Sequence, residues 1–401
     1  MTTLHPRTPE ELTGAVRWAI AAGEAVEVMA GGSKRALGRP VDTPHELDVS
    51  AYSGILSYEP EELVLTAKAG TSLEAIQRAL AEHAQCLAFE PPDLTPLLAA
   101  ATGATLGGAI ATGLSGPRRP RAGGARDHVL GIAAVSGRGE AFVGGGKVVK
   151  NVTGYDMPKL MTGSYGTLAV MTEITLKVLP APEEVRTLLI VGPAVRAAVR
   201  LMSDALQSPA DVSGACHIPA ALSAPGKPAA DAVTALRLEG VRPSVDSRMA
   251  YLRERLQHAG LHHVLDRETS IAYWCTVRDV LPFADAAQRI VWRLSVPPAA
   301  GAAVLERLEH AIPDVCAFLD WGGGLIWIQL PDAQHARAQA VRAAIGTTGG
   351  HAMLIRASAP VRAAVDVFHP QPAALAALSK RVKEQFDPSC VLNPGRMYAG
   401  A

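Results

Sequence analysis

Hydrophobic residues near the start of the chain recur at the spacing of an α-helix. Leu12, Val16 and Ile20 lie four residues apart, which places them on one face of a helix. Residues 8–11 (TPEE) have the sequence of a capping box with proline at the first helical position, and Gly23 follows the last apolar position. This pattern predicts one amphipathic helix that ends at Gly23.

Helix and strand signals continue to alternate through the first half of the chain. Short strands are predicted at 27–29 and 63–69, with a helix after the second strand. Residues 168–179 (LAVMTEITLKVL) alternate at period two until Pro180, which predicts a strand with one apolar face. Residues 85–150 contain glycine pairs and few helix formers, so we expect short strands and long loops there.

In the second half of the chain, apolar runs alternate with helical patterns, and this alternation predicts an α+β domain. This order suggests a ferredoxin-like sandwich. The predicted strands are 187–191, 232–238, 290–296, 316–320, 325–330 and 352–356, and the predicted helices are 194–206, 244–258, 300–311 and 333–345. The Pro-, Ala- and Ser-rich stretch 208–230 is expected to be an irregular connection. A final helix at 372–385 precedes a tail with a turn at 393–395.

Composition and charge exclude several classes of function. The 38 basic and 38 acidic residues cancel, and without a basic run neither nucleic acid nor an anionic membrane is indicated as a partner. The five cysteines form no C-x-x-C pair, so neither an iron–sulfur cluster nor a zinc site is indicated. The start of the chain does not resemble a signal peptide, and we expect a cytoplasmic protein.

One uncharged stretch, 94–115, is long enough to span a membrane. It is rich in glycine and threonine and has few large side chains, so a buried segment that a ligand approaches is the better interpretation. The common dinucleotide, Walker, nucleophile-elbow and metalloprotease motifs are all absent from the sequence.

Three glycine-rich loops remain as candidates for chemistry. Gly31-Gly32-Ser33-Lys34 follows a strand and could form a backbone nest for a phosphate, although a solvated β-turn has a similar composition. The loop 105–113 could expose bare backbone to a flat ligand or be a glycine-kinked core strand. The segment 150–170 could hold a ligand or be a turn between strands. Together the three loops predict an extended ligand with a diphosphate and a planar ring system.

Three segments of the chain resemble the FAD-binding domain of the vanillyl-alcohol oxidase/PCMH flavoprotein superfamily. In order along the chain they are AGGSKRALG, ATLGGAIATG and GGKVVKNVTGYDMPKLMTGSYGTLAVMTEITLKVLP. The third segment and the ending FDPSCVLNPGRMYAG are similar to its 2-hydroxy-acid dehydrogenase branch. Within this branch the chain is most similar to the family of FAD-binding E subunits of bacterial glycolate oxidases. The segments that carry this similarity are WRLSVPP, DWGGG and VFHPQP. The resemblance covers essentially the whole chain.

The resemblance implies a fold and a division into domains. It implies an α+β protein with a PCMH-type FAD-binding domain of two α/β subdomains at 1–182. A ferredoxin-like cap or substrate domain would follow at 183–360, and a C-terminal helix and tail at 361–401 would return to the FAD domain.

The resemblance also implies which residues contact FAD. It assigns the diphosphate to the first loop, the ribityl–diphosphate channel to the second loop and the residues after it, and the adenosine end to the third segment, while the tail returns to the flavin. The residues so implied are Gly31, Gly32, Ser33, Lys34, Arg35, Gly103, Thr105, Leu106, Gly107, Gly108, Ala111, Thr112, Gly113, Ser115, Gly116, Arg118, Gly123, Asp127, Asn151, Thr153, Gly154, Tyr155, Asp156, Ser164, Gly166, Thr167, Leu168, Val170, Asn393 and Arg396.

Two departures from the family pattern carry expectations. Many relatives have H-x-G-D-G-N-x-H, whose histidines bind a metal ion, whereas this chain has DWGGGLIW at 320–327, so no metal site is expected. Residues 30–39 contain neither the histidine nor the cysteine that commonly holds a covalent flavin, and Cys86 is the only cysteine before residue 183. Non-covalent FAD is therefore expected.

Oxidation of a 2-hydroxy acid needs an arginine to hold the carboxylate and a base to take the hydroxyl proton. Arg278 and Arg293 are the candidate carboxylate ligands, and His369 is the candidate base. Each has a structural alternative: an arginine could pair with a core carboxylate, and His369 could hydrogen-bond to backbone. The resemblance favours glycolate, or a similar acid such as D-lactate, as substrate.

The chain has neither cluster ligands nor a nicotinamide motif to take electrons from a reduced flavin. The resemblance implies a complex with a homologous FAD subunit and an iron–sulfur subunit, associated peripherally with the cytoplasmic face of the inner membrane. Two alternatives remain open: a self-sufficient FAD-dependent 2-hydroxy-acid dehydrogenase, and a non-catalytic scaffold subunit that retains the fold.

Overall fold

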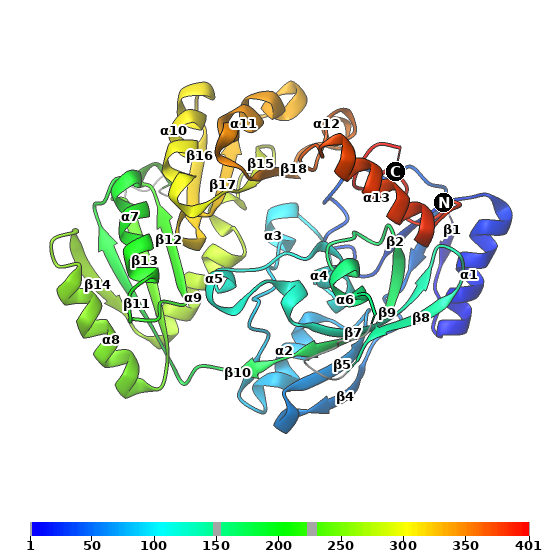
Figure 1. Cartoon of the computed structure of the whole chain (residues 1–401), viewed down its shortest axis with the longest axis horizontal. Coiled ribbons are helices and arrows are strands. Elements are labelled where there is room, and N and C mark those ends of the chain that lie inside the picture. Colours follow the sequence, from blue (N-terminus) through cyan, green and yellow to red (C-terminus); the bar gives the residue numbers. More distant parts are fainter. Residues whose placement is uncertain (1, 147–153, 223–230, 401) are drawn as a thin grey trace. The chain divides into compact units, whose positions relative to one another are not determined.

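The computed structural model describes residues 2–146, 154–222 and 231–400 (Figure 1). The predicted cofactor residues Asn151 and Thr153 lie outside the described residues. The fold is α+β, and the chain divides into two compact units. Unit 1 comprises Met1–Ser115, Gly123–Ala181 and Pro370–Ala401, and unit 2 comprises Gly116–Ala122 and Pro182–His369. The sequence-derived limits 1–182, 183–360 and 361–401 stay predictions about independently folding domains.

A small parallel sheet forms the first layer of unit 1. Its strands are β1 (Thr2–Leu4), β3 (His45–Asp48) and β2 (Val26–Met29), paired in that order. Helix α1 (Pro9–Ala22) begins where the Thr8 hydroxyl accepts a hydrogen bond from the Glu11 N–H, and it ends at Gly23 with φ +66°. Its apolar face packs into a cluster with Val26 and Leu47 of the sheet. β2 therefore delivers the first glycine-rich loop directly from a buried strand.

A five-stranded antiparallel sheet forms the second layer of unit 1. Its order is β4 (Ile55–Glu59), β5 (Val64–Lys68), β9 (Ala169–Lys177), β7 (Val129–Ser136) and β8 (Ala141–Gly145). A minor pair joins β6 (Gln85–Cys86) to β10 (Leu179–Pro180). Besides α1, the α-helices of this unit among the described residues are α2 (Leu73–Ala81), α3 (Thr95–Leu98), α4 (Leu106–Thr112), α6 (Met157–Met161) and α13 (Ala373–Phe386).

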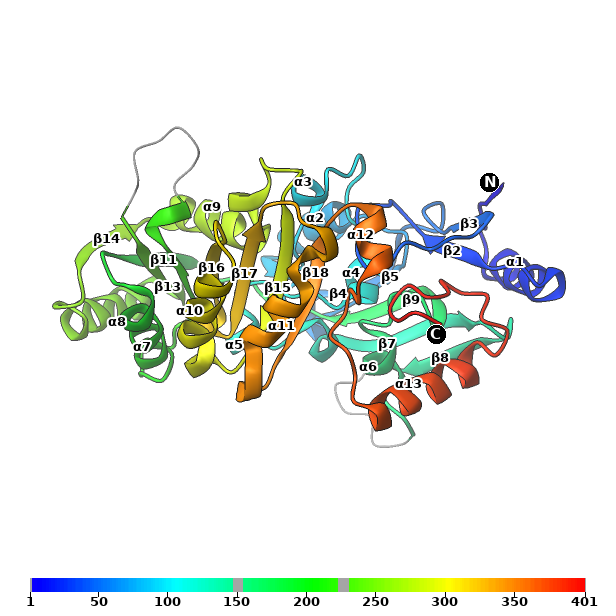
Figure 2. The same ribbon diagram turned by 90° about the horizontal axis from the view of Figure 1, so that it is seen from above.

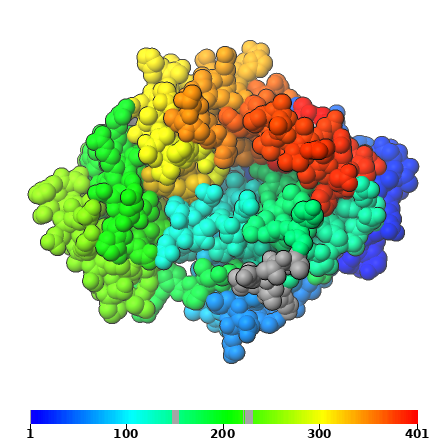
Figure 3. All heavy atoms as spheres, in the orientation of Figure 1, coloured from blue at the N-terminus to red at the C-terminus, as the bar shows by residue number. Residues whose placement is uncertain are grey.

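The C-terminal helix α13 belongs to unit 1 although it follows all of unit 2 in the sequence. Phe386 near its end packs against Phe142 of β8, with ring centroids 6.0 Å apart. Most other side chains of α13 are exposed on the surface (Figure 3). The uncharged stretch 94–115 contains the short helices α3 and α4 and the loop between them. Among the described residues no helix is both long and apolar enough to cross a membrane.

Unit 2 contains two consecutive ferredoxin-like β-α-β-β-α-β repeats that share one sheet (Figure 2). The first repeat is β11 (Glu184–Val191), α7 (Val195–Leu206), β12 (Gly214–Ile218), β13 (Val233–Gly240), α8 (Arg242–Arg255) and β14 (Leu261–Leu265). The second is β15 (Ile290–Ser295), α10 (Gly301–Ala311), β16 (Cys316–Asp320), β17 (Leu325–Leu330), α11 (Ala338–Ile345) and β18 (His351–Arg356).

The two repeats join side by side through their second strands. β12 pairs with β16 where His217 lies opposite Leu319, which gives the order β14-β11-β13-β12-β16-β17-β15-β18. The four repeat helices cover one face with a continuous apolar core. Helix α9 (Arg267–Arg278) packs on the other face, where the Trp274 indole N–H donates to the Thr187 hydroxyl at 2.9 Å. Two short helices, α5 (Arg119–Ala122) and α12 (Ala359–Ala364), complete the unit.

One expectation about this unit was wrong. Residues 208–230 were expected to be an irregular connection, yet 214–218 form the buried strand β12 in the middle of the sheet. This strand, GACHI, is short and contains small residues, so its apolar signal is weak. Its place between β13 and β16 buries all of it except Ile218, because neighbouring strands and α7 supply the contacts.

Candidate functional site

Segments that are far apart in the sequence meet in one cleft of unit 1, which we call the loop cleft. It has a volume of about 90 Å³ and is lined by the end of β2, the loop after it, one side of α4, Tyr165 and the C-terminal tail. The predicted cofactor residues that line it are Gly31, Gly32, Ser33, Lys34, Arg35, Thr105, Gly108, Ala111, Thr112, Asn393 and Arg396. Tyr165 and Glu27 also line it and were not predicted, although Tyr165 stands inside the GSYGTL motif.

The backbone of the first loop offers unused hydrogen-bond donors. In the part of the chain that the structure describes, the N–H groups of Gly31, Gly32, Ser33 and Lys34 have no protein acceptor. Gly32 adopts φ +78°, which a side chain would strain, and a Cβ on Gly31 would lie 2.8 Å from the Gly103 carbonyl oxygen. Successive free N–H groups in such a loop form an anion-binding nest. The loop therefore fits a phosphate ligand.

Lys34 supplies the charge that this nest needs. Its side chain is 9% exposed, and its Nζ has no hydrogen-bond partner among the described residues. Burial lowers the pKa of Lys34 to about 8, although the carboxylate of Asp93 acts in the opposite direction. A buried amine without a partner is costly, so this position fits an anionic group of a ligand in the loop cleft.

The two glycines of helix α4 have different roles, because Gly107 packs against the core and Gly108 lines the loop cleft. Thr105 begins the helix by accepting a hydrogen bond from the Gly108 N–H at 3.3 Å. A Cβ on Gly107 would lie 2.9 Å from the Ala69 Cβ, and Leu106 is fully buried in the core, so these two residues serve packing. Gly108 lines the loop cleft, where a Cβ would meet only the Thr105 hydroxyl, at 3.3 Å, among the described residues.

Asn393 fastens the C-terminal tail across the loop cleft. Its side-chain oxygen accepts a hydrogen bond from the Val28 N–H, and its Nδ2 donates to the Tyr165 carbonyl, both at 2.8 Å. The buried Lys383 of α13 holds the preceding residues, because its Nζ donates to the carbonyls of Thr167 and Leu392 and to the Asp387 carboxylate. The tail thereby fixes the end of β2 relative to the turn at Tyr165.

Two arginines at the loop cleft are occupied by carboxylates. Glu27, which is 3% exposed, accepts from Arg35 and from Arg396, the latter at 3.1 Å. Arg35 also pairs with Glu46 at 2.6 Å. Burial lowers the pKa of Arg35, but its hydrogen bonds to Glu27 and Glu46 leave that pKa above its ordinary value. Arg35 and Arg396 therefore hold the loop in place, whereas the Lys34 amine has no hydrogen-bond partner among the described residues.

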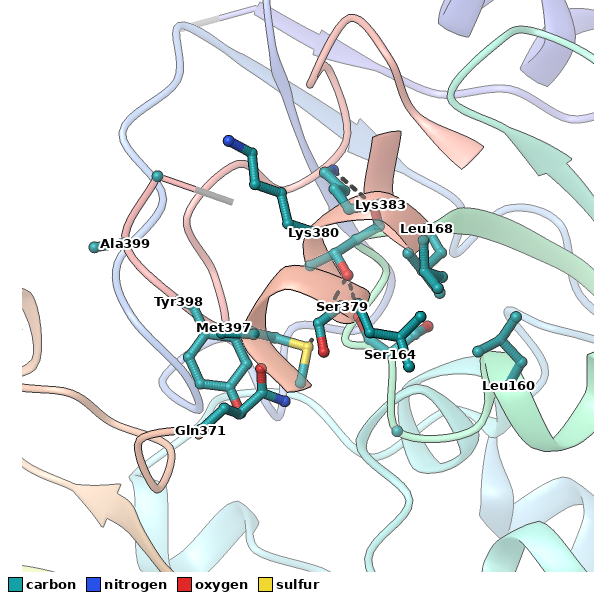
Figure 4. Close-up of a pocket in the computed structure, with 16 residues that line it drawn as sticks. Leu160, Ser164, Leu168, Gln371, Ser379, Lys380, Lys383, Met397, Tyr398 and Ala399 are labelled. Carbon is teal, nitrogen blue, oxygen red and sulfur yellow. Dashed lines mark hydrogen bonds between the residues drawn. The ribbon is translucent and has the colours of Figure 1, made fainter. Parts of the chain in front are cut away.

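Among the described residues of the third predicted loop, Tyr165 alone lines the loop cleft. Ser164, Thr167 and Leu168 line a second cavity of about 530 Å³, the helix cleft, together with α13 and the tail. Figure 4 shows Ser164 and Leu168 facing Ser379 and Lys383 of α13, with Met397 and Tyr398 of the tail beside them. Their predicted contact with adenosine stays a prediction.

The other residues of that segment have local roles. Gly166 adopts φ +68° against the Asn393 amide, and Val170 is 1% exposed in the core. Asp156 accepts from the Lys159 N–H at the start of α6 and pairs with the Lys159 amine at 2.6 Å. Gly154 adopts φ +83° in open space, and Tyr155 is 91% exposed.

The residues that follow the second loop are also separated. In unit 1, Ser115 accepts from the Ala125 N–H, and Asp127 closes the turn that contains Gly123. The glycines Gly103 and Gly113 flank α4, and Gly113 ends it with φ +63°.

Two further members of this predicted set belong to unit 2. The Gly116 carbonyl accepts from the Trp321 indole N–H at 3.0 Å, and Arg118 forms a paired hydrogen bond with Glu239. Burial opposes ionisation of Glu239, yet Arg237 and Arg118 lower its pKa to about 2.

The three candidate catalytic residues all lie in unit 2, in different surroundings. Arg293 of β15 lies over the rings of Trp321 and Trp327, at 5.0 and 6.0 Å from their centroids. Arg278, at the end of α9, binds the carboxylate of its neighbour Asp279 through two hydrogen bonds of 2.7 Å. Arg278 is thus engaged next to its own position in the chain, whereas Arg293 stands on an aromatic surface.

His369 has one ring nitrogen engaged. Its Nδ1 accepts from the Ala352 N–H at 3.3 Å, so the neutral ring carries its proton on Nε2. Burial and, secondly, the charge of Arg342 lower its pKa, which favours the neutral ring. A proton-accepting role for His369 would use Nδ1 and so requires this bond to open. Within the described ranges no group of three His, Cys, Asp or Glu side chains is placed to hold a metal ion.

Comparisons with known proteins agree with this geometry. The family described as "FAD binding domain" matches residues 2–145. The glycolate oxidase subunit GlcE of Escherichia coli (strain K12) is 36% identical over 389 residues, which cover 96% of this chain and 95% of that protein. A D-2-hydroxyglutarate dehydrogenase of Xanthomonas citri pv. viticola is 36% identical over 47% of this chain and 39% of its own length.

Solved structures show the same fold at low sequence identity. An alkyldihydroxyacetonephosphate synthase matches with a TM-score of 0.72 and 17% identity over 98% of this chain and 75% of its own. The resemblance drawn from the three glycine-rich segments is confirmed by the relative that covers 96% of the chain and by the matching FAD-binding family. The chain therefore belongs to the family of the glycolate oxidase subunit GlcE, among the FAD-binding oxidoreductases.

Proposed function

We propose that this chain is the FAD-containing subunit of a glycolate-oxidising complex. Its substrate would be glycolate or a similar small 2-hydroxy acid such as D-lactate, and its product the 2-oxo acid. The observation that carries this proposal is the 36% identity to a glycolate oxidase subunit over 96% of the chain. The loop cleft supports it independently, because the unused backbone N–H groups and the buried Lys34 amine suit a diphosphate.

The residues of the loop cleft would hold FAD without a covalent bond. The N–H groups of 31–34 and the Lys34 ammonium would bind the diphosphate, while Gly108 would let the ligand approach the backbone of α4. When bound, FAD supplies a two-electron acceptor for the oxidation. Asn393 would keep the loop after β2 in position. Glu27 would bind Arg35 and Arg396 through ion pairs, so that the diphosphate would be bound by the loop backbone and Lys34.

The residues of unit 2 would handle the substrate. Arg293 would bind the carboxylate of the acid, since a guanidinium offers two parallel donors and this one rests on two indole rings. His369 would accept the hydroxyl proton at Nδ1 after its bond to the Ala352 N–H opens. Arg278 is a weaker candidate, because Asp279 occupies its two donors.

We further propose that electrons leave through a partner. The five cysteines are scattered in the sequence, and an iron–sulfur subunit together with a homologous FAD subunit would accept the electrons. Two alternatives remain, a self-sufficient dehydrogenase and a scaffold without catalysis. Asp320 and Trp327 stand where many relatives have the histidines of the metal-binding motif, and the loss of that motif slightly favours the scaffold.

Anaerobic titration of the purified chain separates these functions. Because the proposal assigns oxidation to the assembled complex, the expected result is flavin that glycolate bleaches in the complex but not in the isolated chain, together with co-purification of an iron–sulfur protein. Bleaching by glycolate or D-lactate without any partner would show the self-sufficient dehydrogenase, and a chain without flavin would show the scaffold. Acid precipitation is expected to release FAD into the supernatant, and flavin that stays with the pellet would contradict non-covalent binding.

A further inference from the structure

One face of the sheet in unit 2 carries charged side chains next to buried aromatic ones. Arg293 of β15 lies opposite Trp327 of β17 and Met353 of β18. Two residues further along, Ser295 lies opposite His351. Because side chains alternate along a strand, Arg293, Trp327 and His351 project from the same face. The opposite face holds the buried side chains that pack under α10 and α11, among them Trp292, Leu294, Ile326 and Leu354.

A second arginine reaches the same aromatic group. Arg119, in the segment Gly116–Ala122, lies 4.5 Å from the centroid of Trp321, over whose ring Arg293 also lies at 5.0 Å. The Trp321 indole N–H donates to the Gly116 carbonyl at 3.0 Å, which ties this segment to the ring. Arg119 is exposed, and across the described ranges its guanidinium pairs with no carboxylate. Two cations therefore share one indole ring.

The groups that act electrostatically on His351 are basic, and the one carboxylate shown on the same face by strand pairing among these described residues, the buried Asp320, is not among them. Desolvation lowers the pKa of His351, and Arg293, His369 and Arg119 lower it further. These neighbours come from β15, from the residues after α12 and from the segment Gly116–Ala122. A positive charge on His351 is thus opposed from each of these directions. An anion bound here would relieve the repulsion among the side chains.

We propose that Arg119 and Arg293, held over Trp321 with His351 beside them, form a binding site for a small carboxylate. Guanidinium groups bind carboxylates through paired hydrogen bonds, and the indole ring keeps their planes in place. This inference deepens the proposed function and rests on it for the identity of the carboxylate as that of the 2-hydroxy-acid substrate. It adds Arg119 as a specificity-determining residue that no sequence motif indicated.

Calorimetric titration of the FAD-loaded chain with oxalate tests this site. Oxalate has no oxidisable C–H bond, so its binding is measured without turnover, and neutral glycolamide serves as the comparison ligand. Arg119→Met is expected to weaken oxalate binding by about tenfold, since it removes one charge-assisted donor pair. Arg200→Met removes an exposed arginine from α7 and is expected to change binding by less than about twofold. Glycolamide is expected not to compete with oxalate.

The outcome is distinguishable from that of the proposed function. Absence of oxalate binding, or binding that Arg119→Met leaves unchanged, overturns the carboxylate site even where glycolate is oxidised by the complex. Weaker binding in Arg119→Met but not in Arg200→Met supports the site even where glycolate is not oxidised, a result that contradicts only the proposed function. Flavin absorbance of each variant, recorded on the same samples, shows that cofactor content has not changed.

Discussion

The two units of this chain use arginine in contrasting ways. In unit 1, Arg35 and Arg396 are both bound by the buried Glu27, so the loop cleft presents mainly backbone N–H groups and one lysine. In unit 2, Arg119 and Arg293 share the ring of Trp321, and Arg119 pairs with no carboxylate across the described ranges. Arginine near a cleft is therefore informative only after its carboxylate partners are known. Substitutions can break this contrast, from the largest expected effect to the smallest.

Gly108→Val is expected to abolish FAD retention. The valine side chain would project from α4 into the loop cleft and occupy the space that the ligand needs beside the backbone. The ratio of flavin to protein, measured by absorbance after gel filtration, checks this. Gly14→Ala, at a helix position with open space around it, is the control and is expected to keep its flavin. Full flavin occupancy in Gly108→Val would refute the assignment of this cleft to FAD.

Lys383→Met is expected to lower the free energy of unfolding by about 3 kcal/mol, because it leaves the buried Asp387 carboxylate without its cation. The tail would also lose the bonds to Thr167 and Leu392 that place Asn393. Urea unfolding followed by circular dichroism measures the change. The exposed Lys380 of the same helix is the matched control, and Lys380→Met is expected to cost less than about 0.5 kcal/mol. Equal costs for the two variants would contradict the structural role of Lys383.

The sequence predicted the loop cleft better than it predicted unit 2. Glycines in AGGSKRALG and ATLGGAIATG indicated locally that backbone is accessible, and Gly31, Gly32 and Gly108 do line the loop cleft. The NPG sequence indicated a turn, the family resemblance implied that the tail returns to this domain, and Asn393 does join β2 to Tyr165. These signals are local in sequence, and so they could be interpreted before the fold was known.

What sequence reasoning missed depends on long-range pairing. Arg35 was assigned to the phosphate, but the strand β2 brings Glu27 back against it, a contact that spacing alone does not reveal. One ferredoxin-like sandwich was predicted where two repeats exist, since the short strand β12 joins them only through its partners β13 and β16. Arg119 has no motif of its own, and it becomes a candidate because the sheet places Trp321 beneath it.

Lys34→Met is expected to weaken FAD binding by about tenfold at pH 7 and to flatten its pH dependence. With a pKa of about 8, Lys34 is charged below that pH, and a bound diphosphate would raise this pKa, so binding takes up a proton above pH 8. The affinity of the wild type therefore falls as pH rises above 8. Fluorescence titration of the apoprotein with FAD from about pH 6.5 to about pH 9.5 spans this pKa and measures the fall. Lys34→Arg, which stays charged, is expected to remove the fall, and a wild-type affinity that is constant over this range would contradict the pairing.

Arg278→Met is expected to produce the smallest change. Its two donors already bind Asp279, so its loss should weaken oxalate binding by less than about twofold. Arg293→Met should weaken the same binding by about tenfold, because its guanidinium stands over Trp321 beside Arg119. Calorimetry on both variants, with flavin content recorded for each, compares them directly. A larger loss of oxalate affinity in Arg278→Met than in Arg293→Met would show that the carboxylate binds at the end of α9. The arginine paired with Asp279 would then be the ligand-binding one, and the arginine over Trp321 would not.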